Sequence, residues 1–505
     1  METTHGRLKP YILGWLALHL AGWSLVPWLS NHSLHLDTIE ALAWGSEWEW
    51  GYDKHPPLSA WAAEVFGTGF GDWGLYFLSQ LCVVLAGLGV WMLGTELGVR
   101  RPACLLGVIL LDAVYYYQYA TPEFNVNILQ IPFWSWGWWA GFRAVRTGSW
   151  LGWIGLGLAV GLGALAKYLA VLLVVPFLLA LLERGELWQQ LRRPGLYVAG
   201  LVSILVFLPH LNWMRNHDWI TISYGLHRAE GEGMSWWLSR IWYPVEFLLP
   251  QLVFLLPLAV IAFLCRPPRP GPDGDGPGGR PKGLASLSLG GLGLIVFLTI
   301  AFGWRPVMMW AVPMPIAAGL WVAARWIDDG RAVRAAALAL GAGVAGLLAY
   351  GIVYGGSPLF RAKPHRVNYD GRSLAREIEA QWADAHSGPL RFVIGSEWLG
   401  GLVAWYGKDR PSVVIEGDLS RASYVSEEDL RAQGAMVVWL ISIDAADAKT
   451  LGLDQAFPGL RDRHPEVREL RETVIPWPRR RDGKAGRFGV GLIPPAIDPE
   501  DRKAR

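Results

Sequence analysis

Residues 150–182 form one long apolar run, WLGWIGLGLAVGLGALAKYLAVLLVVPFLLALL, which only Lys167 and Tyr168 interrupt. A helix that spans a bilayer needs about 20 mainly apolar residues. Because the run is much longer than that, we expect two short helices, near 150–166 and 168–183, with a tight turn at Lys167. The stretch therefore predicts a fold that is built from membrane-spanning helices.

Similar apolar segments follow one another through residue 353. Hydrophobic residues make up 52% of the chain and charged residues only 17%, whereas soluble domains carry about 25% charged residues. The 30 tryptophans suit a protein with many membrane–water interfaces, where indole rings are enriched. We therefore expect a polytopic α-helical membrane protein with about eleven spans. The remaining spans are expected near residues 11–30, 73–94, 103–120, 126–143, 195–213, 243–264, 284–303, 306–325 and 334–353.

Lys and Arg are distributed unequally between the two sides of these spans. With the N-terminus inside, the inside loops hold more of these residues than the outside loops, as the positive-inside rule requires. An odd number of spans then places the C-terminal region outside. The Pro/Gly-rich segment 266–282 is expected to be a flexible inside linker.

The composition changes near residue 355, where the chain becomes charged and loses its membrane-like character. We therefore divide the chain into a membrane domain, 1–354, and an outside domain, 355–505. Short strands are expected at 390–394, 412–415 and 435–441, and helices at 371–386 and 426–433. These elements predict a small α/β domain, large enough for a core of its own, with a disordered tail after Pro494.

The first outside loop, residues 31–72, is long, acidic and aromatic. Asp37, Glu40 and Glu47 are spaced by three and seven residues, so a helix over 37–48 would place all three on one face. The opposite, apolar side of such a helix, which includes Ile39 and Leu42, could lie against the membrane surface. One interpretation is therefore an amphipathic interfacial helix with a solvated acidic side. The other is a set of catalytic carboxylates.

The segment GYDKHPPLSAW at 51–61 follows immediately and favours the catalytic interpretation. Two successive prolines stiffen the chain where it returns to the membrane, and they would hold Lys54 and His55 at the membrane face. A fixed carboxylate and a fixed cation at this boundary suit a reaction between a lipid phosphate and an acceptor hydroxyl. The carboxylate would take the acceptor proton, and the cation would stabilise the phosphate leaving group.

Further cations on the outside could share this task. Arg305 and Lys167 are candidates for binding a phosphate, because a cation within or beside a membrane span usually has a function or a pairing partner. Two alternatives remain open: Lys167 could extend toward the interface from a helix end, and Arg305 could pair with an outside carboxylate. The loop 214–241 either covers the site as a mobile flap or is a plain interfacial loop.

These motifs resemble the bacterial members of the protein mannosyltransferase superfamily, which includes the 4-amino-4-deoxy-arabinose and galacturonic acid transferases of lipid A and lipopolysaccharide core. The resemblance is carried by Asp37 with Glu40 after a membrane helix, and by GYDKHPPLSAW. TPEFNVN at 121–127 and LAKYLA at 165–170 extend it. It implies the C-type glycosyltransferase fold and an outside, periplasmic active site in the bacterial inner membrane.

The resemblance also implies roles for matching residues. Asp37 corresponds to the proposed general base, and Lys54 to the basic residue that binds the phosphate of a polyprenyl-phosphate-sugar donor. Glu123 lies in the second outside loop, where relatives often have another acidic residue, but here the local sequence is TPE. The candidate site therefore consists of catalytic residues and donor phosphate-binding residues: Asp37, Glu40 and Glu123 for the first, and Lys54, His55, Arg305 and Lys167 for the second.

Two classes of function remain, a membrane glycosyltransferase and a transporter or flippase for a lipid-linked sugar. The sequence has no Walker motif, no dinucleotide fingerprint and no nucleophile elbow, which argues against ATP-driven transport. No long basic block indicates a nucleic-acid partner. We expect a lipid or glycan acceptor and no certain cofactor, with a divalent metal left open. The identities of the sugar and of the acceptor, whether lipid A, core, another glycolipid or a protein, are not specified by the sequence.

Overall fold

The computed structural model describes residues 4–231, 233–266, 282–361, 363–443, 451–480 and 484–496. The chain divides into two compact units, and each is discontinuous in sequence. The membrane unit comprises Met1–Leu25, Lys54–Leu58 and Tyr76–Leu348, and the C-terminal unit comprises Val26–Asp53, Ser59–Leu75 and Ala349–Arg505. The predicted linker 266–282 and the predicted disordered tail lie largely outside the described residues.

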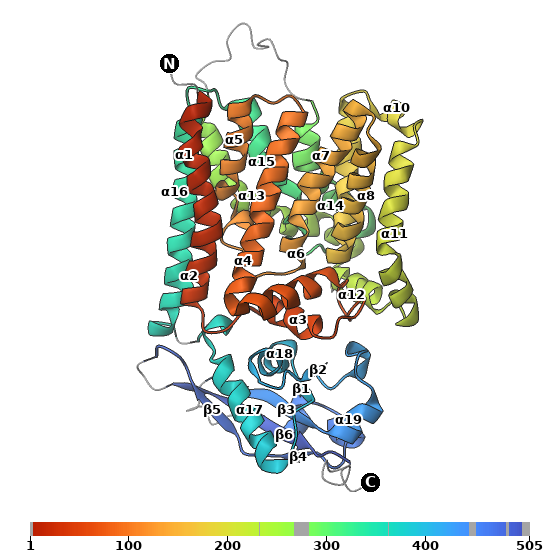
Figure 1. Ribbon diagram of the computed structural model, residues 1–505, viewed down its shortest axis with the longest axis vertical. Coiled ribbons are helices and arrows are strands. Elements are labelled where there is room, and N and C mark those ends of the chain that lie inside the picture. The colour runs from red at the N-terminus through yellow and green to blue at the C-terminus, as the bar shows by residue number, and fades with distance from the viewer. Residues whose placement is uncertain are drawn as a thin grey trace. The chain divides into compact units, whose positions relative to one another are not determined.

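The membrane unit is helical (Figure 1). Its first half contains α1 (Thr4–Ala17), the π-helix η1 (Leu18–Gly22), α5 (Arg101–Ile109), η2 (Leu110–Ala113), η3 (Tyr115–Tyr117), α6 (Val126–Leu129), α7 (Ile131–Thr147), α8 (Trp150–Ala166), η4 (Tyr168–Leu173) and α9 (Val174–Glu183). Its second half contains α10 (Leu187–Leu191), α11 (Gly195–Asn216), α12 (Ile220–Ala229), α13 (Trp236–Cys265), α14 (Leu284–Phe302), η5 (Met308–Ala311), η6 (Met314–Ala317), α15 (Ala318–Trp326) and α16 (Ala332–Tyr350). Helices α2 (Trp23–Ser30) and α4 (Leu58–Glu96) have residues in both units, and the last two residues of α16 belong to the C-terminal unit.

Six helical stretches among the described residues are long and apolar enough to cross a membrane. They are Gly6–Ser30, Leu58–Glu96, Gly195–Asn216, Trp236–Cys265, Leu284–Phe302 and Ala332–Leu359. Trp150–Ala166 and Tyr168–Glu183 are shorter apolar helices, so the predicted total of eleven spans stays a prediction. The chain is an integral membrane protein with the predicted helical fold class.

The predicted interruption of the apolar run at Lys167 is confirmed. Helix α8 ends at Ala166, Lys167 has the extended conformation (φ −161°, ψ 134°), and the 3-10 helix η4 begins at Tyr168. The interruption therefore places a charged residue where the backbone is not helical.

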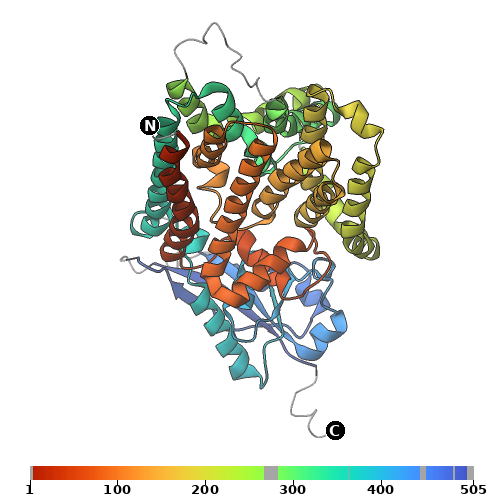
Figure 2. The ribbon, with the colours of Figure 1, turned by 45° about the horizontal axis from the view of Figure 1, so that its top comes forward.

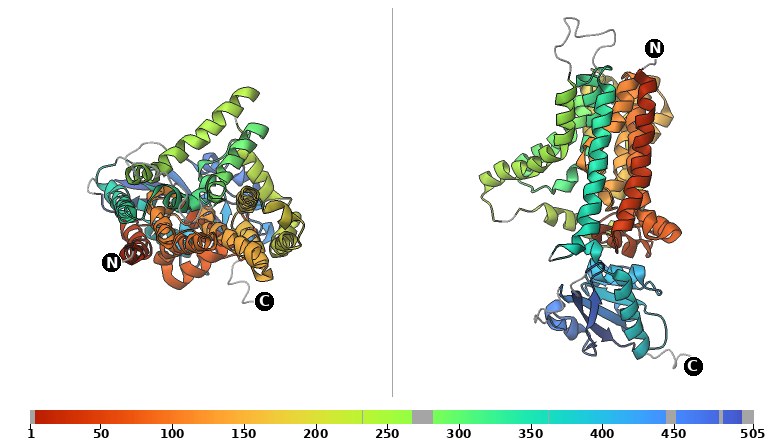
Figure 3. Two further views of the ribbon diagram at one scale, coloured as in Figure 1. Left: turned by 90° about the horizontal axis from the view of Figure 1, so that it is seen from above. Right: turned by 90° about the vertical axis from the view of Figure 1, so that its left-hand side faces the viewer.

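Glycines allow several helices of the membrane unit to pack closely. A Cβ atom on Gly157 of α8 would lie 2.5 Å from the Ala199 carbonyl of α11, and one on Gly161 would lie 2.8 Å from Val206. The four-residue spacing of these glycines is the small-residue pattern that brings membrane helices into contact. Helices α1 and α16, the two ends of the membrane unit in sequence, also lie side by side (Figures 2 and 3), with Gly14 next to Leu340.

Helix α4 contains a break at Gly71, whose φ of 64° and ψ of −157° are not helical. Glycine adopts a positive φ without the steric penalty of a side chain. The residues before the break, from Ser59, belong to the C-terminal unit, and those from Tyr76 belong to the membrane unit. The first loop is therefore structurally part of the C-terminal unit, except for the segment Lys54–Leu58.

The C-terminal unit contains a six-stranded sheet with the order β2-β1-β3-β6-β4, and β5 pairs with β6. The strands are β1 (Phe392–Gly395), β2 (Ser412–Ile415), β3 (Ala435–Ser442), β4 (Arg468–Glu469), β5 (Thr473–Pro476) and β6 (Ala485–Ile493). Its helices include α3 (Leu36–Gly45), α17 (Gly371–Ala385), α18 (Glu397–Tyr406), α19 (Glu427–Gln433), α20 (Leu453–Ala456) and α21 (Leu460–Arg463). Strands β1, β2 and β3 are parallel, and β6 is antiparallel to β3.

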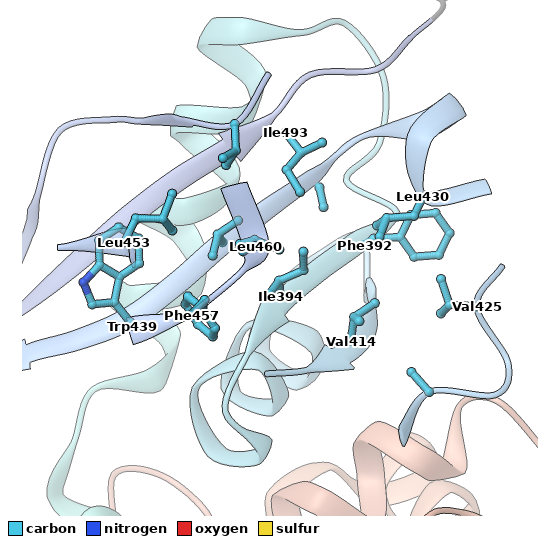
Figure 4. Close-up of a cluster of buried hydrophobic side chains, with 14 of the residues drawn as sticks. Phe392, Ile394, Val414, Val425, Leu430, Trp439, Leu453, Phe457, Leu460 and Ile493 are labelled. Atoms are coloured by element: carbon cyan, nitrogen blue, oxygen red, sulfur yellow. The ribbon is translucent and has the colours of Figure 1, made fainter. Parts of the chain in front are cut away.

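One apolar cluster forms the core beside this sheet (Figure 4). Phe392 and Ile394 of β1, Val414 of β2 and Trp439 of β3 contribute to it. Trp439 lies opposite Gly489 of β6, and a Cβ atom on that glycine would overlap the indole ring. The glycine therefore makes room for the tryptophan, as glycines inside strands often do where another group approaches closely.

Candidate functional site

The predicted helix in the first loop is present as α3, with Asp37 in its first turn. The sequence left open that its apolar side lies against the membrane surface, but in the structure this side packs within the protein. Ile39 is fully buried, and a Cβ atom on Gly401 of α18 would lie 2.4 Å from its side chain. Helix α3 therefore packs on α18 of its own unit (Figure 1), because α18 offers a backbone surface that has no side chain at Gly401.

The three predicted carboxylates differ in their surroundings. Asp37 is half-buried, Glu40 is buried and Glu47 is half-buried in the turn that follows α3. Burial raises the pKa of Glu47, against the effect of hydrogen bonds from Ser412 and Ser46. The C-terminal unit therefore supplies a polar partner to an acid of the first loop, which also argues against a simply solvated acidic face.

His35 lies next to Asp37 and is buried. Its Nε2 atom is 2.8 Å from the hydroxyl of Tyr350, which also accepts a hydrogen bond of 2.9 Å from Asn31. Burial lowers the pKa of His35 to about 4, although the carboxylate of Asp37 acts in the opposite direction. At neutral pH an uncharged imidazole therefore lies beside the candidate base.

Three other acids of the first loop pair with arginines that follow more than 280 residues later. Asp53 accepts a hydrogen bond of 2.9 Å from Arg421, and Glu64 accepts two, of 2.9 and 2.8 Å, from Arg410. Asp72 pairs with Arg372 at 2.7 Å. We did not predict these pairs, because the sequence shows each acid and each arginine only as one charge among many.

A basic cluster forms in the membrane unit around His55. Burial, together with the nearby ammonium groups of Lys167 and Lys54, lowers the pKa of His55 to about 3. The ring of Tyr224 on α12 meets the imidazole edge to face, with the ring centroids 6.1 Å apart. Three of the four predicted phosphate-binding residues are therefore brought together, from segments more than 100 residues apart in sequence.

The same region joins the two weaker motifs. Lys167 donates a hydrogen bond to Oδ1 of Asn127, so TPEFNVN and LAKYLA meet. Asn125 fixes the start of α6, because its side chain accepts hydrogen bonds from the backbone amides of Asn127 and Ile128. Asparagine is one of the residues preferred at this position of a helix. The local sequence therefore orients Asn127, which in turn orients Lys167.

Helix α12, from the predicted flap, contributes a second polar group. The Tyr168 hydroxyl lies 2.7 Å from His210 Nε2 and 2.6 Å from Thr221 Oγ1. Tyr168 follows Lys167 directly, and Thr221 lies one turn before Tyr224 on α12. Thr221 and Tyr224 thus join the candidate site, and sequence analysis had noted only the loop that contains them.

The remaining candidates have other partners. Glu123 is half-buried and interacts electrostatically with Tyr115. Arg305 forms two hydrogen bonds with the carboxylate of Glu246, at 3.0 and 2.5 Å, which is the structural alternative that the sequence left open.

The predicted site residues are divided between the two units. Asp37 and Glu40 belong to the C-terminal unit, whereas Lys54, His55, Glu123, Lys167 and Arg305 belong to the membrane unit. No group of three or more His, Cys, Asp or Glu within the described residues could hold a metal ion.

Known proteins share parts of this sequence and its fold. A family model described as dolichyl-phosphate-mannose-protein mannosyltransferase matches residues 54–213, which include Lys54, His55 and Lys167 but not Asp37. The lipopolysaccharide core galacturonosyltransferase RgtB of Rhizobium johnstonii is 25% identical over 239 residues. This match covers 46% of the present chain and 48%, about half, of that relative's length.

Solved structures of ArnT from Cupriavidus metallidurans have a similar fold. The structure bound to undecaprenyl phosphate has a TM-score of 0.60 and 15% sequence identity, and the match covers 96% of the present chain and 99% of that chain. The structure in the apo state gives the same TM-score and identity, with 95% and 98% covered. These structures confirm the expected fold, because the chain shares the fold of ArnT along nearly its whole length. Over parts of its length the sequence also resembles the protein mannosyltransferase family model and RgtB, as expected.

Proposed function

We propose that the protein is an integral-membrane glycosyltransferase that transfers a sugar from a polyprenyl-phosphate carrier to an envelope acceptor. The observation that carries this proposal is the basic cluster, in which Lys54 and Lys167 lie near one imidazole. Ammonium groups that lie near one another can bind a phosphate together through charge-assisted hydrogen bonds. The lipopolysaccharide-related activity named for RgtB and the undecaprenyl phosphate bound to ArnT support a lipid-linked donor.

The proposed reaction is a single displacement at the anomeric carbon. The bond from that carbon to the carrier phosphate oxygen breaks as the bond to the acceptor hydroxyl oxygen forms. Lys54 and Lys167 stabilise the charge that develops on the departing phosphate, with His55 beside them. Asp37 accepts the acceptor proton as general base, and Glu40 orients Asp37 or the sugar. Glu123 and Arg305 remain candidates for contacts with the donor.

We further propose that the reaction takes place on the periplasmic face of the bacterial inner membrane. The charge asymmetry of the loops supports this orientation, with residues 1–354 as the membrane domain and 355–505 as the periplasmic domain. All three native cysteines are buried, so single introduced cysteines can report on it. In intact cells, a membrane-impermeant thiol reagent should label Ser420→Cys and not Thr147→Cys. The opposite labelling pattern would contradict the orientation.

The decisive experiment uses purified protein in detergent with a radiolabelled sugar on undecaprenyl phosphate and an extract of envelope glycolipids as acceptor. An enzyme forms labelled product without a sealed vesicle, whereas a transporter or flippase forms none. Lys54→Ala should weaken binding of undecaprenyl phosphate by about 10- to 100-fold, the loss expected for a charge-assisted hydrogen bond. Lys408→Ala, an exposed lysine of the C-terminal unit, is the control and should bind as the wild type does.

A further inference from the structure

The segment Lys54–Leu58 occupies an unusual place in the chain. It belongs to the membrane unit, whereas the residues on both sides of it, Val26–Asp53 and Ser59–Leu75, belong to the C-terminal unit. Its sequence is KHPPL, in which two prolines restrict the backbone. The position of Lys54 is therefore set by where the two flanks are held, because little flexibility remains between them.

Arg421 holds the flank that precedes Lys54. Its Nε donates to Asp53 at 2.9 Å, its Nη2 to Glu397 at 2.6 Å and its Nη1 to Glu416 at 3.3 Å. The Asp53 side chain is only 5% exposed, and that of Arg421 is 22% exposed. Glu397 begins α18 and Glu416 follows β2, so the guanidinium fixes Asp53 to two elements of the C-terminal unit.

Arg410 holds the flank that follows Leu58. Two parallel hydrogen bonds join it to Glu64, a geometry that specifies orientation as well as distance. Its guanidinium also lies over the ring of Trp405, 5.0 Å from the centroid. Arg410 has a φ of 48°, an uncommon conformation for a residue other than glycine, which persists where the surroundings fix it.

We propose that Arg421 and Arg410 are positioning residues for the donor phosphate site. By holding Asp53 and Glu64, they fix both flanks of the KHPPL segment and so set the place of Lys54 and His55. This inference rests on the proposed function, because it takes Lys54 as a phosphate ligand. It gives the C-terminal unit a definite role in donor binding, through two arginines that do not themselves touch the donor.

The test measures binding of undecaprenyl phosphate to the purified full-length protein in detergent. Arg421→Gln should weaken binding by about 10-fold or more, since small displacements of a binding group carry losses of this order. Arg431→Gln is the matched control. It removes an arginine from an exposed pair with Glu427 in the same unit, and it should bind as the wild type does.

A double-mutant cycle with Lys54→Ala distinguishes positioning from a general loss of structure. If Arg421 acts through Lys54, then Arg421→Gln should cause little further loss in the Lys54→Ala background. Asp53→Asn provides a second test, because it leaves Arg421 paired with Glu397 and Glu416. It should weaken lipid binding as Arg421→Gln does, and it should cause little further loss in the Lys54→Ala background. This variant keeps the test valid if Arg421→Gln does not fold.

Each outcome bears on one of the two proposals. Wild-type binding by both Arg421→Gln and Asp53→Asn, with Lys54→Ala impaired, overturns the positioning role and leaves the proposed function intact. Equal losses with and without Lys54 also overturn it, since the effect would not pass through that residue. Wild-type binding by Lys54→Ala shows that the phosphate site is elsewhere, and the positioning role falls with it.

Discussion

In the C-terminal unit three acids of the first loop meet arginines, whereas around His55 in the membrane unit two ammonium groups lie near one imidazole. Asp53, Glu64 and Asp72 each pair with an arginine, while Lys54 and Lys167 both act on His55. Opposite charges stabilise each other and hold two segments in place. Two ammonium groups that lie near one imidazole can bind one phosphate through charge-assisted hydrogen bonds. The comparison separates the charges that hold segments of the protein together from those that we assign to donor binding.

The largest expected effect concerns an acid of the C-terminal unit that we place in catalysis. Asp37→Asn keeps the shape of the side chain and removes its basicity, so turnover should fall by about 100- to 10,000-fold. The turnover is measured as the rate at which the purified protein transfers labelled sugar to the acceptor. Glu40→Gln should cost less, and Glu49→Gln, in the same loop but outside α3, should cost little. Near wild-type turnover in Asp37→Asn would place this acid among the structural charges.

The next effect compares two cations of the membrane unit. Lys167→Ala should weaken binding of undecaprenyl phosphate by about 10-fold or more, because it removes a charge-assisted contact. Arg305→Gln should have a smaller effect, because its guanidinium already pairs with Glu246. Titration of both purified variants with the lipid provides the comparison. A greater loss in Arg305→Gln would show that pairing does not identify the structural charges here.

A paired charge of the C-terminal unit should matter for stability. Glu64→Gln leaves Arg410 without its carboxylate, and the Glu64 side chain is only 9% exposed. Breaking a buried pair costs about 3–5 kcal/mol, but Arg410 is partly solvated, so we expect about 2 kcal/mol. The thermal unfolding midpoint of the purified protein should fall by several degrees. Glu427→Gln, from an exposed pair, should leave the midpoint nearly unchanged.

The smallest effect is a pH dependence from His35. Its pKa is about 4 in the folded protein, against 6.5 for the free side chain, so the unfolded chain binds the proton more readily. The stability that comes from its neutral form is present above pH 6.5 and is lost as the pH falls toward 4. Between pH 7 and 5.5 the loss should be about 1 kcal/mol. Unfolding midpoints of the wild type and His35→Gln across this range would show it, and identical pH profiles would contradict it.

Features that depend on neighbouring residues were predictable from the sequence. The break at Lys167, the three strands near 392, 412 and 435, and the helices near 371 and 427 occur as predicted. Each is encoded by a local run of apolar residues or by a capping residue such as Asp370 or Ser426. Strand β6 was missed, because its glycines weaken the strand pattern. For Gly489 the tertiary structure gives the reason, since the indole of Trp439 occupies the space of a side chain there.

The sequence by itself determined that this protein is a helical membrane protein with a small α/β domain, and it named Lys54, His55 and Lys167 as candidates. Only the tertiary structure decided that these three lie together and that the first loop belongs to the C-terminal unit. The physical reason is the separation along the chain of the residues that each interaction joins. Hydrophobic periodicity and capping act within a few residues of one another, whereas an ion pair such as Asp53 with Arg421 joins charges that the chain separates by 368 positions.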